Sequence, residues 1–252
     1  MKSAIILCSG GIDSVTTAYY VKNKLNYNNL EILFFNYGQR AIKAERKASK
    51  FCAREIRAKF LEVDLKWLKN FSSNLTNNQK SYNKLTKKDL KDTKNESLRW
   101  YVPLRNTIFL NYATTLAESE FLKVRDLFGV LDVQDDLKSS WHKKNKTKCD
   151  IFVGFKNEGK EFYPDTTKEY VNQMNKLNSI STISKPKILT PLIKKDKEDI
   201  INLALKLKVP LKKTFSCYTS NSIHCGTCLS CRLRQEGFYW TNQKDETKYL
   251  EK

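Results

Sequence analysis

The chain has 252 residues, which is enough for one large α/β domain or two small ones. Its 46 Lys and Arg residues against 27 Asp and Glu residues give a formal net charge of +19. Because Lys and Asn are abundant along the whole chain, we interpret this charge as a bias of composition and expect no direct binding of nucleic acid; a nucleic-acid surface is the alternative. No stretch approaches the about 20 apolar residues of a membrane span, so we expect no membrane contact.

The first fifteen residues carry the strongest functional pattern. Residues 4–8 are a short apolar run with the length and β-branching of a buried parallel strand. The Ser-Gly-Gly sequence at 9–11 allows a sharp turn, and residues 12–20 predict a helix. A strand, a glycine turn and a helix N-terminus form an anion site, because free N–H groups and the positive end of the helix dipole face one point.

Three side chains of this stretch can act on phosphate groups. Ser9 and Ser14 offer hydroxyl donors, and Asp13 is expected to hold a Mg²⁺ that bridges the phosphates. The patterns Gly-x-x-x-x-Gly-Lys-[Ser/Thr] and Gly-x-Gly-x-x-Gly are absent, which excludes a Walker A loop and a dinucleotide fingerprint. The sequence therefore predicts a phosphate-binding loop of another type. The alternative is a turn between strand and helix without a binding role.

Two further strands and a helix follow. Residues 30–35 predict a buried strand that runs into the polar residues 36–40. Residues 41–60 have helical spacing of apolar side chains, and residues 59–64 predict a third strand. This alternation predicts a doubly wound, mostly parallel sheet with helices on both faces. Polar residues at the carboxyl ends of such strands lie where α/β sheets bind ligands.

The middle of the chain is polar. Residues 66–97 predict a long surface excursion, and residues 108–116 predict a buried helix. The side chains expected to anchor the start of the excursion are Trp67, Leu68 and Phe71. His142 lies alone in a charged stretch, and we interpret it as solvated rather than as a ligand or base. The later predicted elements are a strand at 151–155, a helix at 166–180, a strand at 188–192 and a helix at 196–208.

Four cysteines near the C-terminus have the spacing of a metal site. They are Cys217, Cys225, Cys228 and Cys231, in the pattern Cys-x7-Cys-x2-Cys-x2-Cys. Four thiolates with no open position indicate a structural Zn²⁺, with an iron–sulfur cluster as the rival. His224 is a candidate to replace one of these ligands, but four cysteines already complete the coordination of the ion. Backbone N–H groups of Ser216, Gly226 and Thr227 are expected to face the sulfurs.

The cysteines also bear on domains and compartment. The cysteine spacing is typical of a metal site rather than of a disulfide framework, which predicts a cytoplasmic protein. The N-terminus begins directly with a predicted strand, so we expect no signal peptide. We expect residues 1–210 to form the α/β domain that carries the phosphate-binding turn. Residues 211–252 are expected to form a small zinc-binding segment packed on it, with a helix at 232–238.

Several short blocks occur in one order along the chain and carry a family resemblance. They are Ser-Gly-Gly-Ile-Asp-Ser at 9–14, Tyr-Gly-Gln-Arg at 37–40, Val-Pro-Leu-Arg-Asn at 102–106, Tyr-Pro-Asp at 163–165, Thr-Pro-Leu at 190–192 with Asp-Lys at 196–197, and the cysteine stretch 217–231. The first block resembles the pyrophosphatase loop (PP-loop) of ATP-dependent adenylating enzymes. Together the blocks resemble the family of 7-cyano-7-deazaguanine synthases of queuosine precursor biosynthesis.

The resemblance implies a fold like that of the adenine nucleotide alpha-hydrolases and an ATP-dependent carbon–nitrogen ligase. Such an enzyme makes a nitrile from 7-carboxy-7-deazaguanine, ammonia and ATP. The carboxylate is adenylated, ammonia displaces AMP to give an amide, and a second ATP activates the amide oxygen. The main tasks of the protein are then positioning and the stabilisation of charge. The resemblance also implies Mg²⁺, Zn²⁺ and a homodimer.

The resemblance further assigns roles to residues. Lys197 would be a second phosphate contact, and Arg40 and Arg105 would hold the substrate carboxylate or the AMP phosphate. Asp165 would accept hydrogen bonds from the amino and ring N–H groups of the deazaguanine base. Tyr37 would face the same base. The residues expected to contact the nucleotide or the base are Leu7, Cys8, Ser9, Gly10, Gly11, Asp13, Ser14, Val15, Thr16, Thr17, Tyr37 and Gln39.

Alternatives remain for these roles. In the alternative without a functional role, Arg40 and Arg105 form ion pairs on the surface and Tyr37 is part of the hydrophobic core. Leu104 stands where the family usually has Gly, and Thr166 where it usually has Cys. The family's acidic residue before the Tyr-Pro-Asp block corresponds to either Asn157 or Glu158, and residues 132–149 resemble an insertion. The alternative functions are a paralogue that adenylates another carboxylate or modifies a tRNA or protein, and a zinc-stabilised nucleic-acid binder.

Overall fold

The computed structural model describes residues 2–71, 74–76, 82–125, 149–156 and 163–251. Within this part of the chain, five strands form one parallel sheet in the order β3-β2-β1-β4-β5. The strands are β1 (Ser3–Leu7), β2 (Asn29–Asn36), β3 (Lys59–Asp64), β4 (Cys149–Phe152) and β5 (Ile188–Leu189). The predicted doubly wound parallel sheet is confirmed.

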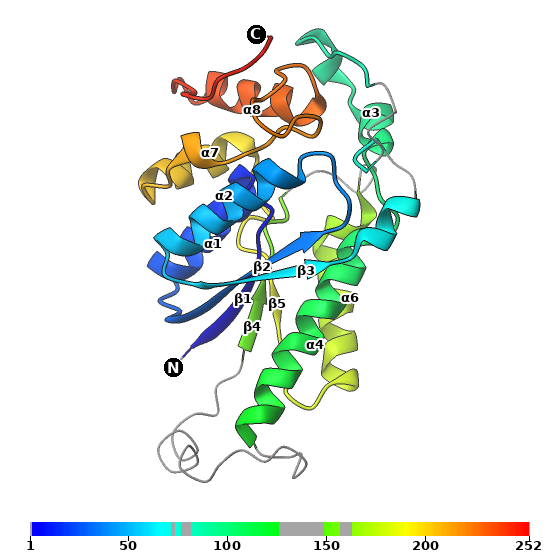
Figure 1. Cartoon of the computed structure of the whole chain (residues 1–252). Helices are drawn as coiled ribbons and strands as arrows, with labels where there is room; N and C mark the ends of the chain where they lie inside the picture. Colours follow the sequence, from blue (N-terminus) through cyan, green and yellow to red (C-terminus); the bar gives the residue numbers. More distant parts are fainter. Residues whose placement is uncertain (1, 72–73, 77–81, 126–148, 157–162, 252) are drawn as a thin grey trace.

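Helices cover both faces of the sheet (Figure 1). One face carries α1 (Ile12–Asn23), α2 (Ile42–Glu55) and α7 (Lys197–Lys206), and the other carries α4 (Arg105–Arg125) and α6 (Lys168–Ser181). The helix α8 (Leu229–Trp240) packs on α7. Alternate β1 residues point to opposite faces, so Ile6 packs with the α1 and α7 side and Ile5 with the α4 and α6 side. Shorter elements are η1 (Lys66–Asn70), η2 (Lys88–Lys91), α3 (Lys94–Arg99), η4 (Pro164–Thr166) and η5 (Leu211–Lys213).

The strand order places a switch point at the carboxyl end of β1. From β1 the chain adds β2 and then β3 on one side, and it later returns to add β4 on the other side of β1. Loops that leave β1 and β4 therefore diverge, and parallel α/β sheets bind ligands in the crevice that this divergence opens. The Ser-Gly-Gly turn at 9–11 lies at this point.

Helix boundaries differ from the predicted ones for local reasons. The predicted helix at 41–60 ends at Glu55, because Arg57 has a φ of 55° and the chain must turn into β3. The predicted helix at 166–180 begins at Lys168, where the Thr167 hydroxyl accepts a hydrogen bond of 3.1 Å from the backbone N–H of Tyr170. The strand predicted at 188–192 has two residues, and the helix predicted at 108–116 is part of the longer α4.

The polar segment after β3, predicted to lie on the surface, also contributes side chains to the hydrophobic core. Leu68 is 1% exposed, and Leu75 and Leu85 are also buried in the core on the α4 side. The predicted anchors Trp67 and Phe71 are instead 49% and 54% exposed. The predicted insertion at 132–149, apart from Cys149 in β4, and His142 lie outside the described residues. No helix in the described part of the chain is long and apolar enough to cross a membrane.

A buried guanidinium fastens the C-terminal tail to the rest of the molecule. The side chain of Arg234 is 1% exposed and forms an ion pair of 2.9 Å with Asp245. It also donates to the Thr214 hydroxyl at 2.8 Å, the Leu211 carbonyl at 3.0 Å and the Thr247 hydroxyl at 2.8 Å. One side chain thus joins α8, the segment before the cysteines and the tail.

The ion pair between Arg234 and Asp245 is expected to stabilise the fold. Arg234→Met leaves Asp245 buried without its cation, so we expect the free energy of unfolding to fall by about 3–5 kcal/mol. Arg46→Met is the matched control, because the Arg46–Glu62 pair is more than a quarter exposed on both sides and should cost about 1 kcal/mol or less. Urea denaturation of both variants measures the difference, and equal losses would contradict the packing role of Arg234.

The glycine turn after β1 has room for a side chain at Gly11 but not at Gly10. Gly10 has a φ of +84°, and a Cβ there would lie 2.7 Å from Ala48 Cβ and 2.8 Å from the Glu45 carbonyl oxygen. We expect Gly10→Ala to lower the free energy of unfolding by about 1–3 kcal/mol. A Cβ on Gly11 would meet nothing closer than 3.6 Å, so Gly11→Ala should cost less than about 1 kcal/mol. Denaturation that ranks the two variants in the reverse order would refute this account.

Candidate functional site

The turn at 9–11 presents backbone donors at the start of α1. Gly11 precedes the first helical residue, Ile12, and no described side chain caps this end of the helix. The first N–H groups of α1 therefore keep their hydrogen-bonding capacity for a ligand, and the helix dipole adds positive potential there. Gly154 follows β4 and closes the turn from the other side, since a Cβ on it would lie 3.0 Å from the backbone of Asp13 and Ser14.

The predicted nucleotide contacts separate into two groups. Those that line one cavity at the carboxyl edge of the sheet are Leu7, Cys8, Ser9, Gly11, Asp13, Ser14, Tyr37 and Gln39. Ser14 donates to the Gly11 carbonyl at 3.1 Å, and its hydroxyl lies 3.5 Å from that of Ser9. Val15, Thr16 and Thr17 are buried within α1, and Gly10 is buried in the turn. None of these four residues lines the cavity, so their contact with a nucleotide stays a prediction.

Asp13 and Lys197 form an ion pair at the mouth of the turn. The Lys197 ammonium donates to both carboxylate oxygens of Asp13, at 2.6 and 2.8 Å. Lys197 is the first residue of α7, so this pair joins the start of α1 to the start of α7. The two side chains predicted to act on phosphate or Mg²⁺ are therefore brought together, and both line the cavity.

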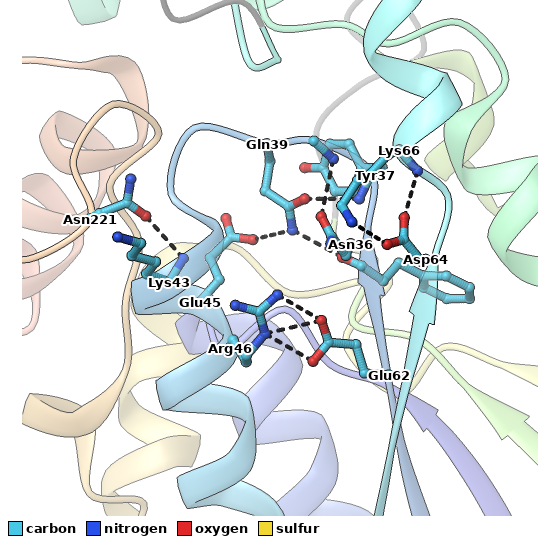
Figure 2. A network of polar contacts seen from close by, with 12 residues as sticks. Asn36, Tyr37, Gln39, Lys43, Glu45, Arg46, Glu62, Asp64, Lys66 and Asn221 are labelled. Carbon is cyan, nitrogen blue, oxygen red and sulfur yellow. Dashed lines mark hydrogen bonds and ion pairs between the residues drawn. The ribbon is translucent and has the colours of Figure 1, made fainter.

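A rigid polar network lies beside the turn, between β2 and α2 (Figure 2). The Gln39 amide donates to the Phe35 carbonyl and to Glu45, both at 2.9 Å, and accepts from the backbone N–H of Tyr37 at 2.9 Å. Burial raises the pKa of Glu45 to about 7, against the Gln39 hydrogen bond and the positive charge of Arg105, which lower it. Glu45 lines the same cavity and was not singled out from the sequence.

Arg105 and Asp165 lie on the opposite wall. The Arg105 guanidinium donates to the Tyr37 hydroxyl at 3.3 Å and lies 5.4 Å from the centre of its ring. Burial raises the pKa of Asp165, and the charge of Arg105 opposes this shift. Among the described residues, Arg105 Nε and Asp165 Oδ1 are buried polar atoms without a hydrogen-bond partner. Such atoms are costly unless a ligand satisfies them, so this wall is suited to bind a polar molecule.

Of the five residues predicted to act in catalysis, Asp13, Arg105, Asp165 and Lys197 line this cavity and Arg40 does not. Its guanidinium donates to the Asn74 carbonyl at 3.4 Å and stacks on Tyr82, 5.6 Å from the ring centre. Its backbone carbonyl accepts a hydrogen bond from Asn221. Arg40 therefore contacts the segment after β3 and the segment of the cysteines.

Aromatic side chains complete the cavity wall. Trp100, Tyr218 and Phe215 line it, and the rings of Trp100 and Tyr218 are 5.1 Å apart. Flat rings around a few polar groups are typical of sites for flat ligands such as a nucleobase. The three residues come from segments with no regular spacing, so the sequence pattern gave no signal for them.

The four predicted metal ligands converge. The sulfur atoms of Cys217, Cys225, Cys228 and Cys231 lie within 4.8 Å of one another and are buried. Backbone N–H groups of Cys225 and Thr219 donate to the Cys217 sulfur at 3.4 and 3.5 Å, and that of Cys228 donates to the Cys225 sulfur at 3.2 Å. These bonds stabilise thiolates, so the cluster is compatible with a metal ion.

His224 and Ser216 do not act on the metal cluster. The backbone N–H of Ser216 donates to His224 Nε2 at 3.0 Å, so the prediction that this N–H faces a sulfur is wrong. Burial and the charge of Arg234 lower the pKa of His224 to about 4, which keeps its ring neutral. Thr227 reaches the Cys225 sulfur at 3.8 Å through its hydroxyl rather than its backbone.

The chain is similar to known proteins over nearly its full length. The model of the family described as queuosine biosynthesis protein QueC matches residues 3–135 and 136–242. The chain is 32% identical over 251 residues to a 7-cyano-7-deazaguanine synthase of Methanosphaera stadtmanae, covering 98% of this chain and 97% of that protein. It is 34% identical over 252 residues to a protein of the same name from Nitratiruptor sp., covering 98% of each.

A solved structure is also similar. It is the U34-tRNA thiolase NcsA from Methanococcus maripaludis with its [4Fe-4S] cluster, at a TM-score of 0.40 and 17% identity, covering 96% of this chain and 65% of that one. That similarity is too low to bear on function. Two family-model matches that together span most of the chain, and relatives of about one-third identity over nearly its full length, do establish the family. The chain belongs to the QueC family of queuosine biosynthesis proteins.

Proposed function

We propose that this protein is a 7-cyano-7-deazaguanine synthase, an ATP-dependent ligase that converts 7-carboxy-7-deazaguanine and ammonia to the nitrile and releases AMP and pyrophosphate. One observation carries the proposal furthest. The phosphate-type turn at 9–11 and the polar wall of Arg105 and Asp165 line one cavity, so a nucleotide and a second ligand can meet there. Membership of the QueC family supports this function over another PP-loop activity.

The turn would serve the ATP half of the reaction. Backbone N–H groups of the turn and of the first turn of α1 would bind the pyrophosphate that leaves, with the Ser9 and Ser14 hydroxyls beside them. Asp13 would bind Mg²⁺, which supplies positive charge to the phosphates. Lys197, now paired with Asp13, would exchange this partner for a phosphate oxygen when nucleotide binds.

The opposite wall would serve the acid half. Asp165 would accept hydrogen bonds from the amino and ring N–H groups of the deazaguanine, and Trp100 and Tyr218 would hold its plane. Arg105 would bind the substrate carboxylate with a planar fork of donors. These contacts would place the carboxylate oxygen against the α-phosphorus of ATP, so that positioning and charge stabilisation provide most of the rate. The role proposed for Arg40 in this step has no support from its position.

We also propose that the four cysteines hold a structural Zn²⁺. A tetrahedral ion with bonds of about 2.3 Å places its sulfurs about 3.8 Å apart. The Cys225 and Cys231 sulfurs are 3.9 Å apart, and all four lie within 4.8 Å. The thiolates of a cubane cluster bind four different iron atoms and so lie further apart. The ion would fold a segment, residues 211–252, that is too small to fold alone, beside an ATP-binding domain of residues 1–210.

The nitrogen source, the oligomeric state and the compartment are inferred from the family and not from the geometry of the site. We propose that ammonia is the nitrogen source, that the protein acts as a homodimer and that it works in the cytoplasm. The aromatic cavity is sized for small molecules, and the family's product is a small base rather than a macromolecule. A tRNA or protein substrate is therefore not part of the proposal.

The function is tested by incubating the protein with ATP, Mg²⁺, ammonia and 7-carboxy-7-deazaguanine. We expect mass spectrometry to find the nitrile, with two AMP formed for each. Asp13→Asn should reduce the rate by about 100-fold or more, because Mg²⁺ and Lys197 lose their carboxylate. The same variant should change the free energy of unfolding by no more than about 1 kcal/mol, since the Asp13–Lys197 pair is partly exposed. An unchanged substrate mass with the wild-type protein would refute the proposal.

The metal is tested by elemental analysis. We expect about one zinc per chain and no stoichiometric iron. Cys228→Ser should lower zinc content and Tm together, by about 10 °C if several kcal/mol are lost. Cys149→Ser is the control, because Cys149 lies in β4, away from the cluster, and should keep the zinc. Four irons with labile sulfide in anaerobically purified protein would instead assign a cluster.

A further inference from the structure

Glu45 is a buried carboxylate on the cavity wall that the assignments above leave without a role. It lies in the first turn of α2 and is 9% exposed. It lines the same cavity as the glycine turn, Arg105 and Asp165. A carboxylate is costly to bury, so its presence here calls for a ligand or a chemical task.

The orientation of this carboxylate is fixed. Both hydrogens of the Gln39 amide are used, one by the Phe35 carbonyl and one by Glu45 Oε2, and the amide oxygen accepts from the Tyr37 N–H. The amide therefore cannot flip, and Oε2 is held as an acceptor. Figure 2 shows the second oxygen of Glu45 turned away from Gln39. Within the described chain, Gln39 is the only hydrogen-bond partner of the Glu45 side chain, so Oε1 is left for a ligand with an N–H group.

The position of Glu45 is beside the phosphate-binding turn. Its own carbonyl oxygen would be 2.8 Å from a Cβ on Gly10, so α2 packs directly on the turn. Bond exchange at an acyl adenylate takes place next to the phosphates, so the proposed function puts the reacting atoms in the part of the cavity that Glu45 lines. Asp165 comes from η4 on the other wall and is held by Asn106. Asp13 lines the turn as well, but both of its oxygens are engaged by Lys197.

We infer that Glu45 binds the ammonia that attacks the acyl adenylate and takes the proton that its nitrogen loses. This inference rests on the proposed function. The nitrogen lone pair forms the C–N bond to the acyl carbon, and the C–O bond to the AMP phosphate breaks with its electron pair leaving on AMP. One proton passes from nitrogen to Glu45 Oε1, which returns it to solvent after the amide forms.

The test separates the steps with Glu45→Gln, which keeps an amide oxygen as acceptor for Gln39. Adenylation is measured without ammonia, as exchange of labelled pyrophosphate into ATP that depends on 7-carboxy-7-deazaguanine. Amide formation is then measured with ammonia in a single turnover. We expect exchange to stay within about threefold of wild type while amide formation falls by about 100-fold or more. Glu45→Asp should recover part of the loss, and a second measurement that starts from the amide should give the nitrile at a rate near that of wild type.

The control is Glu55→Gln, an exposed position at the other end of α2, which should leave every step unchanged. Amide formation at the wild-type rate in Glu45→Gln would overturn the inference. Equal losses of exchange and amide formation would also overturn it, because Glu45 would then only hold the site together. Absence of exchange in the wild-type protein would instead reject the proposed function, so the two failures are distinguishable.

Discussion

The contact between Gly10 and the start of α2 is the constraint on which the site depends. Gly10 adopts a left-handed conformation against Ala48 and the Glu45 carbonyl, where a side chain has no room. The Ser49 hydroxyl donates to the Cys8 carbonyl at 2.7 Å and fastens the same two segments. Because α2 is pressed on the turn, the phosphate donors and the network of Gln39 and Glu45 keep one geometry. The packing of the protein itself thus organises the site, which is what positioning catalysis requires.

The sheet supplies the second half of this arrangement. The switch between β1 and β4 opens the crevice, and Gly154 lets β4 approach the first turn of α1. Across the crevice, the start of α4 carries Arg105, whose charge faces the two buried carboxyls, Glu45 and Asp165. Their pKa values are raised by burial, and the guanidinium limits the shift. One cavity therefore holds a phosphate-binding wall and a wall for a polar, flat ligand.

Local patterns allowed part of this to be predicted. The turn at 9–11 and the four cysteines depend on short spacings, so both were visible in the sequence and the structure brings each set together. Arg40 follows the motif equally well but points to the segment after β3, because a motif does not state which side of a loop a side chain takes. Glu45 was missed since it lies in an amphipathic helix among other charges. The position of Glu45 beside the turn follows from the packing of α2 on Gly10. This packing joins segments 35 residues apart, so no local pattern indicates it.

In the proposed reaction, the turn holds a departing pyrophosphate while an acyl oxygen takes AMP. Substrate acid labelled with ¹⁸O in both carboxylate oxygens tests this most directly. If each oxygen is activated in turn, every AMP released should carry one ¹⁸O and the pyrophosphate none. If the label appears instead in inorganic phosphate, with ADP as the other product, the acid is phosphorylated rather than adenylated and the account of the turn is wrong.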